Sequence, residues 1–344
     1  MQPEDTAVLT RDQITATAST IVEQQSHDGM ILWFSDGHAD TWNHTEAAMA
    51  LSAAGFLDAA GRAYEWLAKT QLSDGSWHHY YLADGVEDAK VDTNCCAYVA
   101  TGVWHHYLTT EDFSFLEEMW PIASRSLDFV VGHQNAAGHI PWAIHTSGTP
   151  WSYSLITASS SIYHSLRCGI AIAQRLGKER PEWEFAAVRL ADVLRHHESE
   201  FEPKTRWAMD WYYPVLTGTI TGEPASQRLA ARFEDFVLGN HGVRCVSDQP
   251  WVTAAETCEC AMAYLAVGDE HGARKLFESI QALRDTDGAY FTGMVYPDRI
   301  TFPDNERSTY SSAAVVLAAD AFDCKSQASR LVLGEGLPLS LIHI

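Results

Sequence analysis

The sequence is poor in basic residues and has no long hydrophobic run. Its 344 residues include 23 Lys and Arg against 45 Asp and Glu, which gives a formal net charge of −22. A charge of this sign disfavours nucleic acids, anionic membranes and diphosphate-rich ligands as partners. Because no stretch of about 18 apolar residues occurs, no membrane span is expected. The acidic N-terminus has no hydrophobic secretory segment, which favours a cytoplasmic location.

The usual signatures of disulfide, metal and nucleotide chemistry are also missing. Seven cysteines, an odd number, lie mostly in apolar helical patterns, so we expect buried free thiols. The chain has no serine nucleophile elbow, no glycine-rich phosphate loop and no H-E-x-x-H motif. Adjacent histidines diverge by about 100° on a helix and cannot share a metal ion. The sequence therefore predicts neither a metal nor a cofactor.

Helical periodicity recurs along the whole chain, without a linker rich in Pro, Gly or Ser. Helices with a charged face, such as residues 181–200, alternate with small, nearly uncharged ones, such as residues 156–177. The first kind belongs at a surface and the second in an interior. Together they predict twelve helices, near residues 10–26, 44–55, 57–71, 92–110, 113–134, 156–177, 181–200, 207–217, 224–238, 250–268, 269–285 and 308–323.

Short and long connections alternate in the same way. Most charged helices are followed by a long loop, at residues 27–43, 72–91, 135–155, 239–250 and 286–307. Several of these helices end in Gln, a spacer, Gly and an aromatic residue, as in Gln71–Trp77 and Gln134–Trp142. The pattern predicts one all-α domain over residues 10–323, a closed ring of six hairpins with the long loops on one face. Most of the twelve Trp lie in or beside these loops, so we expect the functional site there.

This organisation resembles the (α/α)6 toroids, and two stretches carry a closer resemblance to the glucoamylase-type six-hairpin glycosidases. These are HADTWNHTEAAMALSAAGFLDAAGRAYEWLAKTQLSDGSW and, further on, DTNCCAYVATGVWHHYLTTEDFSFLEEMWPIASRSLDFVVGHQ with GHIPWA. The segment STYSSAAVVLAAD is similar to the last inner helix of that family. In addition, RAYEWLAKTQLSDGSW is similar to a repeat of squalene-type cyclases, and the whole chain resembles actinobacterial proteins labelled prenyltransferase.

The glycosidase resemblance implies roles for several acidic residues. Asp40, with Trp42 and Asn43, falls where that family grips its substrate, and Asp92 falls where an acidic residue lines the pocket. The family's general acid is a Glu that follows a Trp in the third long loop, but here Ala143 follows Trp142. The general base lies in the last long loop, for which Asp298, Asp304 and Glu306 are available, Glu306 being nearest the helix.

Inverting hydrolysis of a glycoside requires two carboxyl groups, one protonated and one ionised. Glu306 or Asp298 would serve as base, and Asp92 or Asp210 would replace the missing acid. Asp210 lies among aromatic residues in MDWYYP, and Glu256 lies on an apolar helix, where it is either paired with Arg244 or functional. Residues suited to stack on or hydrogen-bond a sugar are Asp40, Trp42, Asn43, Trp77, Asn94, Trp142, His145, Trp151, Trp211, Arg244, Trp251 and Glu256.

The leading hypothesis is therefore a glycoside hydrolase-like enzyme that acts on an oligosaccharide. One alternative is a terpenoid cyclase or prenyltransferase, although the chain lacks D-x-D-D and a basic cluster. The other is a non-catalytic glycan-binding toroid, because Ala143 stands where the acid is expected. Residues 324–344 lose helical periodicity and end in LSLIHI, which resembles a translated sequencing adapter, so we expect a non-native or disordered tail.

Overall fold

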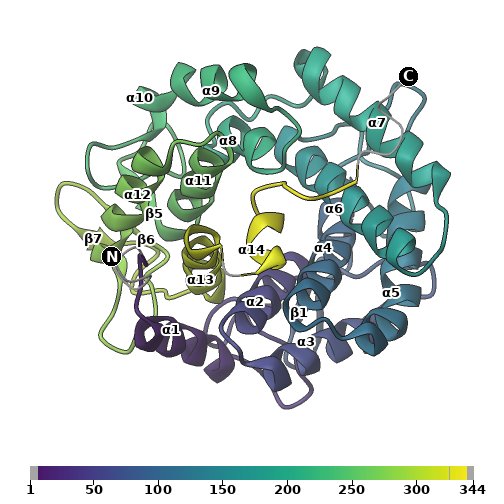
Figure 1. The fold of residues 1–344 in the computed structure, drawn as a ribbon, viewed down its shortest axis with the longest axis horizontal. Coiled ribbons are helices and arrows are strands. Elements are labelled where there is room, and N and C mark those ends of the chain that lie inside the picture. Colours follow the sequence, from purple (N-terminus) through teal and green to yellow (C-terminus); the bar gives the residue numbers. More distant parts are fainter. Residues whose placement is uncertain (1–6, 325, 339–344) are drawn as a thin grey trace.

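The helices form a closed ring of six hairpins, viewed along its axis in Figure 1. The computed structural model describes residues 7–324 and 326–338. Each inner helix packs on the next, and the last packs on the first, which closes the ring. The inner helices are α2 (Thr41–Ala53), α4 (Thr93–Thr110), α6 (Ile156–Arg175), α8 (Met209–Leu216), α11 (Ala254–Ala266) and α13 (Thr309–Asp323). The outer helices are α1 (Arg11–Glu23), α3 (Leu57–Thr70), α5 (Phe113–Gly132), α7 (Pro181–His196), α9 (Gly222–Ala231) and α12 (Glu270–Ser279).

Three predicted outer helices are shorter than expected and end in a short additional turn. These turns are η2 (Glu198–Glu200), α10 (Phe233–Phe236) and η3 (Ile280–Leu283). The loops also contain strands that the sequence analysis did not predict, because segments of two to four residues are too short to show an alternating pattern. The strands are β1 (Tyr80–Leu82), β2 (Gly85–Asp88), β3 (Val91–Asp92), β4 (Ala143–Ile144), β5 (Trp251–Thr253), β6 (Gly293–Val295) and β7 (Ile300–Thr301).

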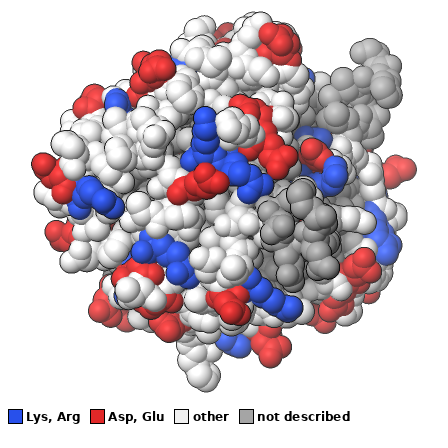
Figure 2. Space-filling view, turned by 60° about the vertical axis from the view of Figure 1, so that its left-hand side comes forward, with Lys and Arg blue, Asp and Glu red and all other residues white. Residues whose placement is uncertain are grey.

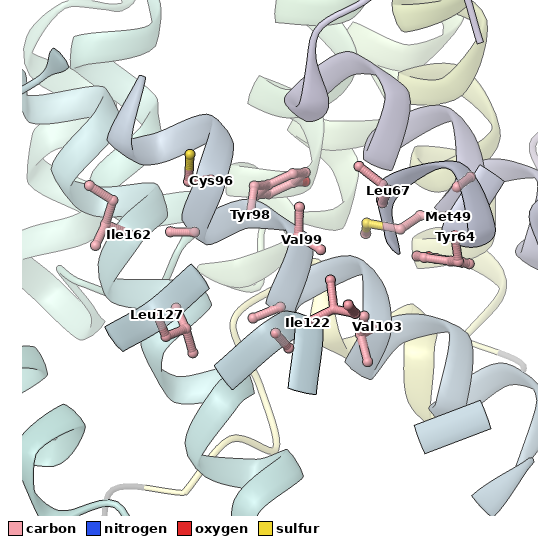
Figure 3. Packing of buried hydrophobic residues seen from close by; sticks show 14 of the residues in the cluster. Met49, Tyr64, Leu67, Cys96, Tyr98, Val99, Val103, Ile122, Leu127 and Ile162 are labelled. Carbon is pink, nitrogen blue, oxygen red and sulfur yellow. The ribbon is translucent and has the colours of Figure 1, made fainter. Parts of the chain in front are cut away.

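The inner helices are small and apolar because they are enclosed on all sides. On α4, fourteen residues are buried, whereas α3 buries one stripe of its surface. Figure 3 shows Tyr98, Val99 and Val103 of α4 packed among side chains of the neighbouring helices. A Cβ atom at Gly102 would lie 2.3 Å from Thr45 Cγ2 of α2, so glycine permits the close approach of the two helices.

The Gln–Gly repeat ties neighbouring outer helices together. The Nε2 atom of Gln71 donates to the Gly75 carbonyl in its own turn and to the Ile122 carbonyl of α5, each at 2.9 Å. Gln134 does the same with Gly138 and with Ala186 of α7, at 2.9 and 3.0 Å. The repeat therefore closes each hairpin and fixes it to the next hairpin along the chain.

The end of the described chain lies inside the ring, which corrects the expectation of a disordered tail after Asp323. Residues 327–331 form α14 (Gln327–Leu331), drawn in yellow near the axis in Figure 1. Leu331 is buried, and its carbonyl lies 3.0 Å from His164 Nε2 of α6. Arg167 donates to the Leu337 carbonyl at 3.0 Å. Apolar burial and these bonds hold the segment without a long periodic helix; residues 339–344 lie outside the described residues.

The remaining expectations of composition concern the thiols, the membrane and the charges. All seven cysteines are free thiols, and all except Cys324 are buried. Among the described residues, no helix combines the length and hydropathy needed to cross a membrane. On the face drawn in Figure 2, Lys and Arg lie beside Asp and Glu rather than in a basic patch. This face thus offers no surface of the kind that binds nucleic acid.

We predict that acid destabilises the fold through buried His44. Its Nδ1 accepts the Ile31 N–H at 3.1 Å and its Nε2 lies 2.9 Å from the Ala63 carbonyl, so the ring is neutral. Burial lowers the pKa of His44 from 6.5 to about 4, so the unfolded chain binds a proton first and stability falls as the pH drops from 6.5 to about 4. Urea unfolding should be measured at pH 6.5 and at pH 5. Between these pH values, the free energy of unfolding should fall by about 2 kcal/mol less in His44→Gln than in wild type. An equal loss in both proteins would contradict this role.

Candidate active site

The six long connections meet on one face of the ring, above the N-termini of the inner helices. Backbone bonds join loops that are distant in sequence. Ala39 and Tyr81 exchange N–H···O bonds of 2.8 and 2.9 Å, and β3 pairs with β4. The Thr309 N–H at the start of α13 donates to the Trp33 carbonyl at 2.7 Å. The loops therefore support one another and hold their side chains over the axis.

Asp40 and Asp92 are adjacent carboxyl groups at this face. Asp40 caps α2 by accepting the Asn43 N–H at 2.8 Å, and Asp92 caps α4 by accepting the Asn94 and Cys95 N–H groups at 2.9 and 3.1 Å. Burial raises the pKa of Asp40, and burial together with the charge of Asp40 raises the pKa of Asp92 to about 6. Since two neighbouring buried carboxyl groups resist ionising together, this pair retains a proton more readily than an exposed Asp would.

His79 and Cys95 surround Asp92. One ligand atom from each of these three buried residues lies within 4.8 Å of the others, a grouping that could admit a metal ion. The Nδ1 atom of His79 and the Oδ1 atom of Asn94 are buried, and neither has a hydrogen-bond partner in the part of the chain that the structure describes. Unpaired buried polar atoms are costly, and they are equally suited to bind the hydroxyl groups of a ligand. The absence of a metal stays a prediction.

Aromatic rings extend from Asp92 along the loop at residues 139–155. The Trp142 side chain is a hydrogen-bond partner of Asp92, and its ring is stacked with Tyr153 at 5.9 Å between centroids. Trp151 meets the Trp142 ring edge-on at 4.8 Å and is stacked with His145 at 5.2 Å. Trp142, Trp151 and Tyr153 are partly exposed, so they form a continuous aromatic platform beside Asp92.

Glu256 lies at the loop end of α11, facing the inside of the ring. The Cys245 thiol is its hydrogen-bond partner. Burial is the main cause that raises the pKa of Tyr212 and Tyr310, and the charge of Glu256 raises both pKa values further. Arg244, the expected partner, instead donates to the Asp235 and Ser247 carbonyls at 3.4 and 3.3 Å. Glu256 is only partly buried, so its carboxylate is accessible from the loop face.

A second pair of acids lies deeper on the axis, and sequence reasoning missed it. Tyr98 donates to Glu46, while Tyr212 and Tyr310 both donate to Glu259. Burial raises the pKa of Glu46 to about 7 and also raises the pKa of Glu259. Both acids line a cavity of about 30 Å³, together with Tyr98 and Tyr213. Glu46 lies in the first turns of α2, which is capped by Asp40.

The other predicted catalytic acids lie away from this region. Asp298 is exposed in the turn between β6 and β7. Glu306 accepts a hydrogen bond from Thr292 Oγ1 at 2.8 Å and lines a cavity of about 290 Å³ between α1 and the start of α13. Asp210 is buried at the seam of α6 and α8, where its Oδ1 accepts the Thr157 hydroxyl at 2.7 Å. Asp210 and Glu306 thus have hydrogen-bond partners other than Asp92 and Glu256.

Several predicted sugar-binding aromatics have structural partners. Trp77 is 1% exposed and donates to the Leu67 carbonyl at 3.0 Å. Trp211 is buried against Phe236, and Trp251 donates to the Phe302 carbonyl at 3.1 Å. In contrast, Trp42 is partly exposed and meets Tyr98 and Tyr213 edge-on at 5.9 and 6.0 Å, which places it at the axis.

Comparison with known proteins gives this geometry a context. No family model matches the chain. The chain is 45% identical over 334 residues to the MMP endo-(1,4)-3-O-methyl-α-D-mannosidase of Mycolicibacterium hassiacum, covering 97% of this chain and 92% of that protein. No support for a terpenoid cyclase or a prenyltransferase comes from this relative.

Solved structures share the fold at low sequence identity. A wild-type glycosidase aligns with a TM-score of 0.74 at 13% identity, over 95% of this chain and 97% of that one. A D-mannose isomerase aligns with a TM-score of 0.68 at 15% identity, over 90% and 96% of the two chains. A sugar epimerase from a ruminal bacterium aligns with a TM-score of 0.69 at 12% identity, over 90% and 98%. The all-α toroid predicted from the sequence is confirmed, and the chain belongs to the family of the M. hassiacum mannosidase, as a glycoside hydrolase that acts on a glycan.

Proposed function

We propose that the protein is an endo-acting, inverting hydrolase of α-(1→4)-linked 3-O-methyl-D-mannose chains. The name of the 45%-identical relative states that linkage and that sugar for the relative, and the alignment spans nearly the whole of both chains. The free thiols support a reducing, cytoplasmic location for this activity.

The position of three carboxyl groups carries the proposal. Asp40 and Asp92 lie at the first turns of α2 and α4, and Glu256 lies at the first turn of α11. In the ring, two inner helices separate α4 from α11 in either direction, so Asp92 and Glu256 lie on opposite sides of the axis. Inverting hydrolysis uses such an arrangement, because a water molecule must fit between the base and the sugar.

The roles follow from the surroundings of each group. The Asp40–Asp92 pair holds a proton and donates it through Asp92 to the departing glycosidic oxygen. Glu256, which is only partly buried, takes a proton from the water that attacks the anomeric carbon from the opposite side. The oxygen of that water stays on the anomeric carbon of the new reducing end. The departing chain keeps the glycosidic oxygen, which becomes a hydroxyl group with the proton from Asp92.

The aromatic platform suits a methylated sugar. A 3-O-methyl group removes a hydroxyl donor and adds apolar surface, which stacks well on Trp and Tyr rings. The remaining hydroxyl groups can bond to the buried His79 Nδ1 and Asn94 Oδ1 atoms, which have no hydrogen-bond partner among the described residues. Trp142, Trp151 and Tyr153 would then support the sugars next to the cleaved bond.

Removal of Trp151 should weaken substrate binding more than turnover. Its ring meets Trp142 edge-on and is stacked with His145, so Trp151→Ala should raise KM about tenfold and change kcat by less than about twofold. Phe185→Ala is the matched control, because that ring is 63% exposed on the outer helix α7. Steady-state kinetics with a defined oligomer measures both constants, and an unchanged KM would argue against the platform.

Product analysis tests the proposal directly. The protein is incubated with an α-(1→4)-linked 3-O-methyl-D-mannose oligomer, and products are followed by mass spectrometry and by proton NMR. We expect internal cleavage with the β-anomer of the new reducing end appearing first. Early α-anomer would show retention, release of single terminal sugars would show exo-action, and no cleavage would refute the substrate assignment.

A further inference from the structure

A large cavity on the flank of the ring is separate from the carboxyl groups at the axis. Its volume is about 1050 Å³, and it lies between the outer helices α7 and α9 with α8 behind it (Figure 1). Phe201 and Trp211 contribute apolar surface, while Asp210, Lys204, Gln227 and Arg228 contribute polar groups. A cavity of this size and mixed lining is typical of a small-molecule or oligosaccharide site.

Asp210 points to a ligand in this cavity. The residue is 6% exposed, and its Oδ1 atom accepts the Thr157 hydroxyl at 2.7 Å. Its Oδ2 atom is buried and has no hydrogen-bond partner among the described residues. A buried carboxyl oxygen without a partner is costly, so a hydroxyl group brought by a ligand would relieve the deficit.

The charges of the cavity favour a neutral ligand rather than an anion. Arg228 is held by both Glu198 oxygens at 2.8 and 2.9 Å and Arg232 by Asp235 at 2.9 Å, so these two charges are compensated. Arg195, which also lines the cavity, donates to the Thr219 carbonyl at 2.7 Å. The carboxyl group of Asp210 would repel a phosphate or a carboxylate at the floor of the cavity. Half-buried Lys204 and exposed Gln227 remain as donors and acceptors for hydroxyl and ring oxygens, and apolar surface is available for sugar faces.

Part of the cavity lining lies at the same face as the proposed active site. Asp210 is in the first turn of α8, and Phe201 and Lys204 lie in the connection before it, which is one of the loops of that face. We propose that the α7–α9 cavity binds a distal segment of the same neutral, methylated glycan, beyond the sugars that are cleaved. This inference rests on the proposed function, because an endo-acting hydrolase meets chains that extend well past its catalytic groups.

The test compares a long and a short α-(1→4)-linked 3-O-methyl-D-mannose oligomer. Asp210→Asn replaces the unpaired acceptor, and Gln227→Trp fills the cavity from the exposed face of α9. In each variant, the ratio of kcat/KM for the long oligomer to kcat/KM for the short one should fall about tenfold, equivalent to about 1.4 kcal/mol. Ser226→Trp is the matched control, because it adds the same bulk one residue away, outside the cavity lining.

An unchanged ratio in both Asp210→Asn and Gln227→Trp would overturn the inference. Should wild type cleave neither oligomer, the proposed function would be wrong, and direct titration of the long oligomer would decide the cavity alone. A Kd that weakens in Gln227→Trp but not in Ser226→Trp would then support a glycan site, whereas equal Kd values in all three proteins would exclude it.

Discussion

Glu256→Gln is expected to lower kcat by about 10²- to 10⁴-fold, because it removes the group that activates water. The amide has nearly the same size and can still accept from the Cys245 thiol, so the fold should be retained. KM should change far less than kcat, because the lost interaction matters mainly in the transition state. Single-turnover kinetics on a defined oligomer measures the chemical step directly.

The matched controls are Glu306→Gln and Asp298→Asn. Both residues lie before the last inner helix, where the resemblance to glucoamylase-type enzymes places the base, yet Glu306 is hydrogen-bonded to Thr292 and Asp298 is exposed in a turn. Each variant should keep kcat within about twofold of wild type. Loss of turnover in Glu306→Gln with full turnover in Glu256→Gln would instead support the assignment made from the resemblance.

Asp92→Asn is expected to cause a comparable loss of kcat, because it removes the proton donor while its Oδ1 atom still caps α4. In wild type, Asp92 must be protonated to act. Its pKa is raised to about 6, chiefly by burial, so kcat/KM should fall as the pH rises through about 6. A pH profile of kcat/KM from pH 4 to pH 8 checks this alkaline limb.

Asp40→Asn separates the pair. The charge of Asp40 contributes to the raised pKa of Asp92, so its removal should move the alkaline limb to lower pH. A merely structural role for Asp40 would lower activity without moving the limb. A limb that stays in place in Asp40→Asn would thus contradict the coupling between the two carboxyl groups.

The ring could be predicted because, in an all-helical chain, the burial of a helix determines how many charged residues it carries. Helices enclosed on every side carry almost no charge, as in residues 156–177, whereas outer helices keep one wet face, as in residues 181–200. No sequence pattern indicates the loop strands, because β3 and β4 have two residues each and form through pairing between distant loops.

The site was predicted only in part, because the sequence shows which residue types are present but not the direction in which each side chain points. Asp40 and Asp92 were chosen from the family resemblance and Glu256 from its apolar helix, and the structure places all three at the loop ends of inner helices. Residues three apart on a helix point about 60° from each other, so Tyr213 lines the cavity at the axis while Asp210 lies at the seam with α6.

The deep acids were missed for a related reason. Glu46 and Glu259 look like ordinary helix residues in sequence, and only the closed ring brings their tyrosine partners to them. A buried carboxyl group on an apolar helix is the one signal that could have indicated them. Glu259 shares such a helix with Glu256, but the sequence analysis assigned a role to Glu256 alone.

The position of α14 has a practical consequence for handling this enzyme. Val332, just after α14, forms one wall of the small cavity between Glu46 and Glu259. A protein shortened at Asp323 would lack Val332, and bulk solvent could enter the cavity from the side opposite the substrate. Glu46 and Glu259 would then ionise more easily, and their charges would repel each other inside the ring. Affinity tags are therefore better placed at the N-terminus, and truncation after Asp323 should be avoided.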